Sequence, residues 1–98
     1  MIEAADEAMG FMAGHTPTGL ESDRKTLFAV IRCIEIIGEA AARISDATRS
    51  SAPDVPWSAI VGMRNRLVHA YFDVDADLVW KTTSVELPAL KARLQALI

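Results

Sequence analysis

The spacing of apolar residues in the middle of the chain constrains the fold more than any other feature. These residues follow one another in alternating steps of three and four: Leu27, Val30, Ile34, Ile37, Ala41 and Ile44. Steps of this size place side chains on one face of an α-helix, and Glu21-Ser22-Asp23 just before them can cap a helix start. We therefore predict a long amphipathic central helix. Further apolar residues widen its face, so that it should pack on several neighbours: Ala29, Cys33, Ile36 and Ala40.

Two features of the predicted central helix concern its surroundings. Gly38 costs about 1 kcal/mol of helix stability relative to alanine, which predicts a close crossing with another helix at this position. The remaining face holds charged residues at spacings that permit ion pairs along the helix: Arg32, Glu35, Glu39 and Arg43. We interpret this row as a solvent-exposed face.

Turn-forming residues divide the chain into segments. They gather at residues 14–19, 45–56 and 72–77. A short amphipathic helix is expected over residues 2–13, before the Gly- and Pro-rich loop. Residues 45–54 are expected to form a connector with room for one short turn of helix.

Two more helices are expected in the second half of the chain. The third begins at Pro56, a residue that suits a helix start, and ends near residues 71–72. The last begins with Asp75 or Asp77 as its cap and contains Pro88, which should kink or divide it. The expected fold is all-α, an antiparallel bundle of four to five helices.

Composition limits where the chain works and what it binds. Its 98 residues fit one domain, residues 1–98, because a second core would leave each half too small. We predict a cytoplasmic protein without a membrane partner, because Cys33 has no second cysteine to pair with, no stretch could span a bilayer, and the first residues lack the basic flank of a signal peptide.

A net charge of −3 implies that any RNA contact is local. The apolar fraction of 51% is high for one small bundle and favours an oligomer.

One short stretch is basic in this acidic chain. Residues 62–71 hold two arginines, a histidine, an asparagine and a tyrosine but no acid. His69 can exchange a proton near neutral pH, and Arg64 can hold a phosphate and offset the charge that develops as a phosphodiester is attacked. These are the two roles that a ribonuclease without a metal requires. The structural interpretation is a salt bridge of Arg64 with Glu35 or Glu39, and a hydrogen-bonded boundary position for His69.

The spacing of Arg64 and His69 raises a geometric problem. On the expected third helix they lie five residues apart, about 140° around the axis, with Asn65 on the same side as His69 and Arg66 toward solvent. A long reach of the arginine, a distorted helix, or two copies of the segment across a two-fold axis could bring them to one site. We prefer the two-fold arrangement, because it also accounts for the apolar surplus.

Other kinds of site are not indicated. Neither His15 nor His69 has a cysteine or an acid at metal-ligand spacing, which makes a zinc site improbable. The alternating Asp73, Asp75 and Asp77 lack the glycine and the later glutamate of a calcium loop. No glycine-rich phosphate loop is present. We therefore predict neither a metal ligand nor a cofactor.

Three stretches are similar to a known family. Residues 56–75, and above all Arg-Asn-Arg-Leu-Val-His-Ala-Tyr at 64–71, resemble the signature of HepT-like proteins, a branch of the HEPN superfamily. Residues 34–41 resemble the central helix of that family, and residues 87–90 resemble its last helix. The resemblance implies a HEPN-like fold and a metal-independent endoribonuclease toxin. It also implies a homodimer whose paired motifs form the RNA cleft, and a minimal nucleotidyltransferase (MNT) antitoxin that neutralises it.

The same resemblance implies roles for single residues. Arg64 and His69 match the catalytic pair, and Asn65 matches the polar residue beside the arginine. Tyr71 matches the tyrosine that the antitoxin modifies with AMP, and we expect Arg66 to bind substrate. Two other functions stay open on the sequence: a non-catalytic helical module that dimerises or docks a partner, and a domain that binds a nucleotide without cutting RNA.

Overall fold

The computed structural model describes residues 1–70 and 73–97, with the backbone alone at 69, 70 and 73. The elements in chain order are α1 (Ile2–Met12), α2 (Pro17–Ser22), α3 (Arg24–Ala42), α4 (Asp46–Ser51), α5 (Trp57–Val61), α6 (Met63–Leu67), β1 (Val68–Ala70), β2 (Asp73–Val74), α7 (Ala76–Lys81), the π-helical turn η1 (Thr82–Glu86) and α8 (Leu87–Gln95). The described fold is helical apart from one short pair of strands, which confirms the predicted all-α class. The described helices are shorter and more numerous than the four to five predicted.

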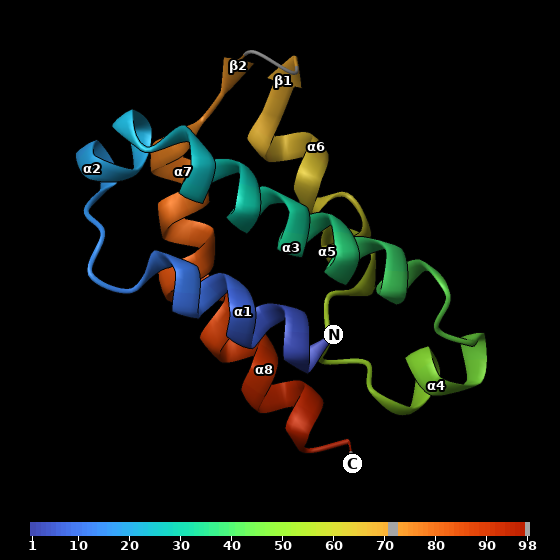
Figure 1. The fold of residues 1–98 in the computed structure, drawn as a ribbon. Coiled ribbons are helices and arrows are strands. Elements are labelled where there is room, and N and C mark those ends of the chain that lie inside the picture. The colour runs from blue at the N-terminus through green and yellow to red at the C-terminus, as the bar shows by residue number, and fades with distance from the viewer. Residues whose placement is uncertain (71–72, 98) are drawn as a thin grey trace.

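The long helix α3 forms the centre of the structure (Figure 1). The carboxylate of Asp23 caps its start by accepting hydrogen bonds from the backbone N–H and the hydroxyl of Thr26. These bonds, the hydroxyl first, hold the pKa of Asp23 below its usual value. Most of the predicted apolar positions from Leu27 to Ala41 are buried, whereas Ala29 and Ala40 are partly exposed and Ile36 is 37% exposed. The prediction of a long central helix is confirmed.

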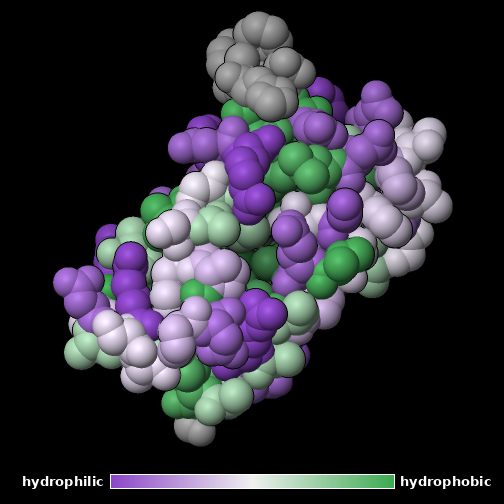
Figure 2. Space-filling view, turned by 180° about the vertical axis from the view of Figure 1, so that it is seen from behind, coloured by the Kyte–Doolittle hydropathy of each residue, from purple (hydrophilic) through white to green (hydrophobic). Residues whose placement is uncertain are grey.

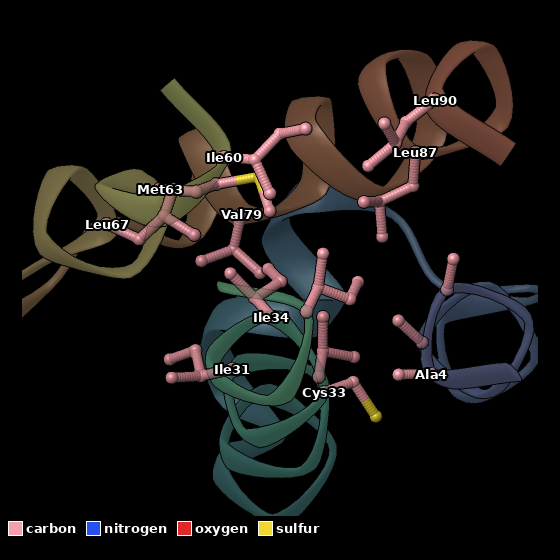
Figure 3. Packing of buried hydrophobic residues seen from close by; sticks show 14 of the residues in the cluster. Ala4, Ile31, Cys33, Ile34, Ile60, Met63, Leu67, Val79, Leu87 and Leu90 are labelled. Carbon is pink, nitrogen blue, oxygen red and sulfur yellow. The ribbon is translucent and has the colours of Figure 1, made fainter. Parts of the chain in front are cut away.

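Two groups of elements pack on different sides of α3. On one side lies α1, which runs antiparallel to α3 and brings Ala4 to face Cys33 (Figures 1 and 3). On another side Ile60 and Met63 point toward Ile34 and complete the core (Figure 3). Burying an aliphatic side chain of this size contributes about 1.5–3 kcal/mol. The same burial raises the pKa of the Cys33 thiol.

The predicted close crossing is present at Gly38. A Cβ atom at this position would lie 3.3 Å from the carbonyl oxygens of Ile60 and Val61. Those oxygens belong to the backbone of α5, which cannot move aside as a flexible side chain can. Gly38 therefore allows α5 to approach α3 more closely than any larger residue would.

The predicted third helix is wrong in its second half. The chain breaks at Gly62 into the two short helices α5 and α6, and α6 ends at Leu67. Val68 is extended (φ −123°, ψ 106°) and pairs with Val74 of β2, while the carbonyl of Leu67 accepts a hydrogen bond from the N–H of Asp75. Pairing with β2 and the β-branched side chains of Val68 and Val74 both favour the strand. His69 consequently lies on β1 and not on the helix of Arg64.

The last helix is divided, as Pro88 predicts. Asp75 caps α7 by accepting a hydrogen bond from the N–H of Leu78. In a regular α-helix the ring of Pro88 would clash with the carbonyl of Ser84. The π-helical turn η1 lies at this point, and the N–H of Leu87 donates to the carbonyl of Thr82, five residues back. The wider turn is how the structure accommodates the proline.

One short helix departs from the expected loop over residues 14–19. Thr16 caps α2 by accepting a hydrogen bond from the N–H of Gly19, and Pro17 occupies the first helical position. Helix α4 corresponds to the short turn expected in the connector. Among the described residues, no helix combines the length and the apolar character needed to cross a membrane.

Candidate functional site

Arg64 lies where α6 meets α3, and its partner there is Glu35. The guanidinium Nε of Arg64 donates to Oε1 of Glu35 at 3.2 Å, across 29 residues of sequence. The side chain of Arg64 is 42% exposed and that of Glu35 31% exposed. The predicted pairing of Arg64 with an acid of the central helix is therefore confirmed, and one edge of the guanidinium stays in contact with solvent.

Glu35 also holds a second arginine. Its other carboxylate oxygen, Oε2, accepts from Nη1 of Arg32 at 3.3 Å, and the same nitrogen lies 3.6 Å from Oε1 of Glu39. The charged row of α3 was interpreted as a solvent-exposed face, but Glu35 reaches a neighbouring helix. Each carboxylate oxygen of Glu35 thus contacts a different arginine. Glu35 therefore holds Arg64 through Nε alone and leaves both Nη atoms of Arg64 to other partners.

Arg64 and Asn65 are brought together. Nη1 of Arg64 donates to Oδ1 of Asn65 at 3.3 Å. Among the described residues Nη2 of Arg64 has no hydrogen-bond partner. A guanidinium has five N–H donors in a planar fork, so Arg64 keeps donors for an anion while Glu35 and Asn65 orient it.

Two shallow grooves meet at the Glu35–Arg64 pair. Both residues line each groove, and the two volumes are about 470 Å³ and about 310 Å³. The larger, the helix groove, is also lined by Gly38, Glu39, Val61 and Asn65. The smaller, the strand groove, is also lined by Phe28, Arg32, Val68 and Val74. A bound molecule could reach Arg64 from either groove.

Large apolar side chains are exposed in both grooves. Val61 in the helix groove is 42% exposed and Phe28 in the strand groove is 43% exposed. The guanidinium carbon of Arg24 lies 4.8 Å from the centre of the Phe28 ring, in a cation–π arrangement. The sequence interpretation missed Phe28 as part of the site. The signal for it was available, since Phe28 follows the buried Leu27 and lies outside the apolar series of α3.

Arg66 lies in a different groove from Arg64. Its Nη2 donates to the carbonyl of Ala59 at 3.4 Å, and the side chain is exposed, as the sequence predicted. The groove beside it, about 310 Å³ between α5 and α8, is mainly apolar and has Arg93 as its second arginine. Figure 2 views the molecule from this side, where hydrophobic surface lies between hydrophilic residues.

The two remaining predicted site residues are described partly or not at all. His69 is described only by its backbone in β1, and Tyr71 lies outside the described residues. The predicted separation of Arg64 from His69 by 140° around one helix does not apply, because α6 ends at Leu67. The described residues contain no group of three or more His, Cys, Asp or Glu side chains that could hold a metal ion.

Comparison with known proteins gives one family for nearly the whole chain. The profile of the family described as "Ribonuclease HepT-like" matches residues 1–97. A protein of Thermococcus cleftensis named "Probable ribonuclease HepT" is 45% identical over 75 residues, which are 76% of this chain and 68% of that protein.

Two proteins of Methanocaldococcus jannaschii, each named a "Putative RNase", align over more of the chain. One is 33% identical over 98 residues, covering 100% of this chain and 81% of its own length. The other is 35% identical over 95 residues, covering 97% and 87%. No solved structure gives a significant match.

Proposed function

This chain belongs to the HepT-like ribonuclease family, and we propose that it is a metal-independent endoribonuclease that cuts RNA beside Arg64. The observation that carries the proposal is the half-exposed Arg64, held by Glu35 and Asn65 at the meeting point of two grooves. An arginine oriented in this way is prepared to bind a phosphate before the reaction begins. The names of the three relatives above agree with an RNA substrate.

The proposed reaction is an internal transfer within the RNA. The 2′-oxygen attacks the neighbouring phosphorus and the bond to the 5′-oxygen breaks, which leaves a 2′,3′-cyclic phosphate. His69 takes the proton of the 2′-hydroxyl or supplies one to the leaving 5′-oxygen. Arg64 stabilises the negative charge that builds up on the phosphorane, and Asn65 keeps the guanidinium in place. Arg66 binds the RNA backbone away from the reacting phosphate.

The test is cleavage of a labelled RNA by the purified protein, with and without EDTA. Arg64→Ala and His69→Ala should each lower kcat by about a hundredfold or more, and EDTA should have no effect. Lys81→Ala, which removes one exposed positive charge outside the grooves that contain Arg64 and Arg66, is the matched control and should cut as the wild type does. Loss of cleavage in EDTA with recovery on adding a divalent ion would contradict the proposal.

The active form is a homodimer in which two copies of the site face each other. The support is the exposed apolar surface beside Arg64, namely Phe28 and Val61. Such surface on a small protein favours association with another chain. Val61→Glu should convert a dimer into a monomer in analytical ultracentrifugation and reduce cleavage. Val85→Glu changes a more exposed valine in η1, outside both grooves, and should leave the dimer intact.

The chain acts as the toxin of a toxin–antitoxin pair, and an MNT antitoxin inactivates it by attaching AMP to Tyr71. The support is the sequence match at Tyr71, two residues after His69. An added phosphate near Arg64 would compete with the RNA for the guanidinium. After incubation with ATP and the nucleotidyltransferase, the intact mass should rise by one AMP, and a Tyr71→Phe variant should show no rise. An equal rise in the variant would place the modification elsewhere.

The alternative is a non-catalytic helical module. The observation that favours it is the Glu35–Arg64 ion pair itself, since a charge pair between two helices can be purely structural. Under this alternative Arg64→Ala lowers the unfolding temperature and the wild type cuts no RNA. Under the ribonuclease proposal the same variant keeps the wild-type circular dichroism and loses cleavage alone.

A further inference from the structure

A pocket separate from the Arg64 grooves contains polar atoms without partners. It measures about 260 Å³ and lies between α1, the loop after α1, and the α7–η1 segment. Its lining includes Met9, Met12, His15, Trp80 and Thr83. Two lining atoms are buried and have no hydrogen-bond partner among the described residues, Nδ1 of His15 and Oγ1 of Thr83, and Thr83 is only 1% exposed. Buried polar atoms are rarely left unpaired, so the pocket is built to hold something.

The imidazole of His15 has a defined protonation pattern. Its Nε2 lies 3.2 Å from Oδ2 of Asp23. An ionised carboxylate only accepts hydrogen bonds, so Nε2 must carry the proton. In the neutral ring Nδ1 therefore has a free lone pair. A histidine that donates one ring N–H to a carboxylate and offers the other nitrogen has the arrangement of a metal ligand.

Two thioether groups line the same pocket. Met9, Met12 and His15 are spaced by three residues each, and α1 ends at Met12. The backbone N–H of His15 donates to the carbonyl of Met12 at 2.9 Å, which keeps the histidine next to the helix end. The indole N–H of Trp80 donates to the carbonyl of His15 at 3.4 Å, so the tryptophan lies against the same loop. In Figure 1 this end of α1 lies beside the segment that follows α7.

We propose that this pocket binds one Cu(I) ion through the sulfur atoms of Met9 and Met12 and Nδ1 of His15. Thioether sulfur is a soft ligand that selects Cu(I), whereas zinc favours thiolate, imidazole or carboxylate, and calcium and magnesium favour oxygen. A ligand set of two thioethers and one neutral imidazole has no charge, so it suits a monovalent ion better than a divalent one.

The ligands of this site differ from those in the sequence patterns of zinc and calcium sites. Methionine is absent from those patterns, and the acid that contacts His15, Asp23, does so at the opposite ring nitrogen. The proposal is independent of RNA cleavage, because the pocket shares no lining residue with the grooves at Arg64.

The test uses Ag(I), which has the same charge and ligand preference as Cu(I) and does not change oxidation state under these conditions. The full chain, labelled at the methionine methyl groups, is titrated with Ag(I) and followed by NMR. The Met9 and Met12 methyl signals should shift together and saturate at one ion per chain. Met63, a buried residue of α6, is the internal control and should not shift. Shifts of all methionines alike, or none at a slight excess of Ag(I), would overturn the proposal.

Variants then assign the ligands. Met9→Leu keeps the apolar volume at a partly exposed position and should weaken Cu(I) affinity about tenfold or more against a competing chelator, whereas Met63→Leu should not change it. Asp23→Asn should weaken binding about tenfold to a hundredfold by releasing the ring of His15. Wild-type affinity in Met9→Leu would overturn the proposed ligand set, because Met9 would then contribute nothing to Cu(I) binding. Circular dichroism confirms that each variant is folded.

Discussion

The helix α3 and the segment from α5 to β2 both supply the candidate site, but they are built differently. Helix α3 runs without a break for 19 residues, with a capped start and a continuous buried face. The other segment consists of two helices of 5 residues each and a short strand pair. Glu35 comes from the continuous element and Arg64 from the interrupted one.

This difference indicates how the site is held. A short helix has few internal hydrogen bonds and depends on its neighbours for stability. Helix α6 has neighbours on both sides, α5 through Gly62 and β1 through Val68. The position of Arg64 therefore depends on the crossing at Gly38 and on the contact with Glu35, more than on the helix that contains it.

The largest effect on RNA cleavage should come from changing Arg64, the member of the ion pair that lies in the interrupted segment. Arg64→Lys keeps the positive charge but loses the planar fork, so one ammonium cannot contact Glu35, Asn65 and a phosphate together. We expect kcat for RNA cleavage to fall by about a hundredfold with the unfolding temperature nearly unchanged. Steady-state kinetics and thermal denaturation measure the two quantities. Wild-type cleavage in Arg64→Lys would mean that charge alone is sufficient.

The next largest effect, on stability, should come from changing Gly38, where α3 and α5 cross. Gly38→Val places a branched side chain against the carbonyl oxygens of Ile60 and Val61 and should lower the free energy of unfolding by about 1–3 kcal/mol. Gly10→Ala is the matched control, because nothing lies within 4 Å of a Cβ there. It should raise the free energy of unfolding by about 0.5–1 kcal/mol. Urea denaturation measures both, and equal effects of the two changes would remove the argument for a close crossing.

A smaller effect on RNA cleavage should come from changing Glu35, the member of the ion pair that lies in the continuous helix α3. Glu35→Gln removes the charge that orients Arg64 while keeping the size of the side chain. Because both partners are partly exposed, we expect little change in stability. We expect kcat to fall about tenfold with KM nearly unchanged, since a misplaced arginine affects the transition state more than RNA binding. Glu35→Asp should recover part of the loss. A purely structural role would instead lower the unfolding temperature.

The smallest effect, on stability, should come from changing Asp75, which lies just after the interrupted segment. Asp75 caps α7 and its N–H anchors the carbonyl of Leu67, so the cap lies next to the end of α6. Asp75→Ala removes the side-chain bond only and should cost about 1 kcal/mol. Asp77→Ala, an exposed acid in the first turn of the same helix, should cost less. Similar losses in both variants would mean that charge matters there and capping does not.

The same contrast explains what the sequence could predict. In α3 the apolar steps continue over many residues, and only a helix fits them. Between Leu67 and Val74 the apolar run is short and is compatible with a helix or a strand. Pairing of Val68 with Val74, a tertiary contact, decides between them. The short helix α2 was read as a loop because Pro17 and Gly19 interrupt helices, although Thr16 followed by proline is also a helix start.

For the candidate site, the sequence predicted the ion pair but not the grooves around it. The ion pair of Arg64 with an acid of α3 followed from the cost of an unpaired half-buried charge. The grooves did not follow, because Phe28, Val61 and Val74 approach Arg64 only through the arrangement of three elements. The separation of Arg66 from Arg64 into another groove depends in the same way on the position of α8.

The wide turn η1 has a consequence for how this chain can change in evolution. A π-helical turn contains one residue more than the α-helical turn that could replace it. Deleting a single residue between Thr82 and Glu86 would therefore leave α7 and α8 with the same faces toward the core, whereas a deletion inside α3 would rotate every later side chain by about 100°. Related chains that differ by one residue in length can thus keep the same core if the gap falls at this turn.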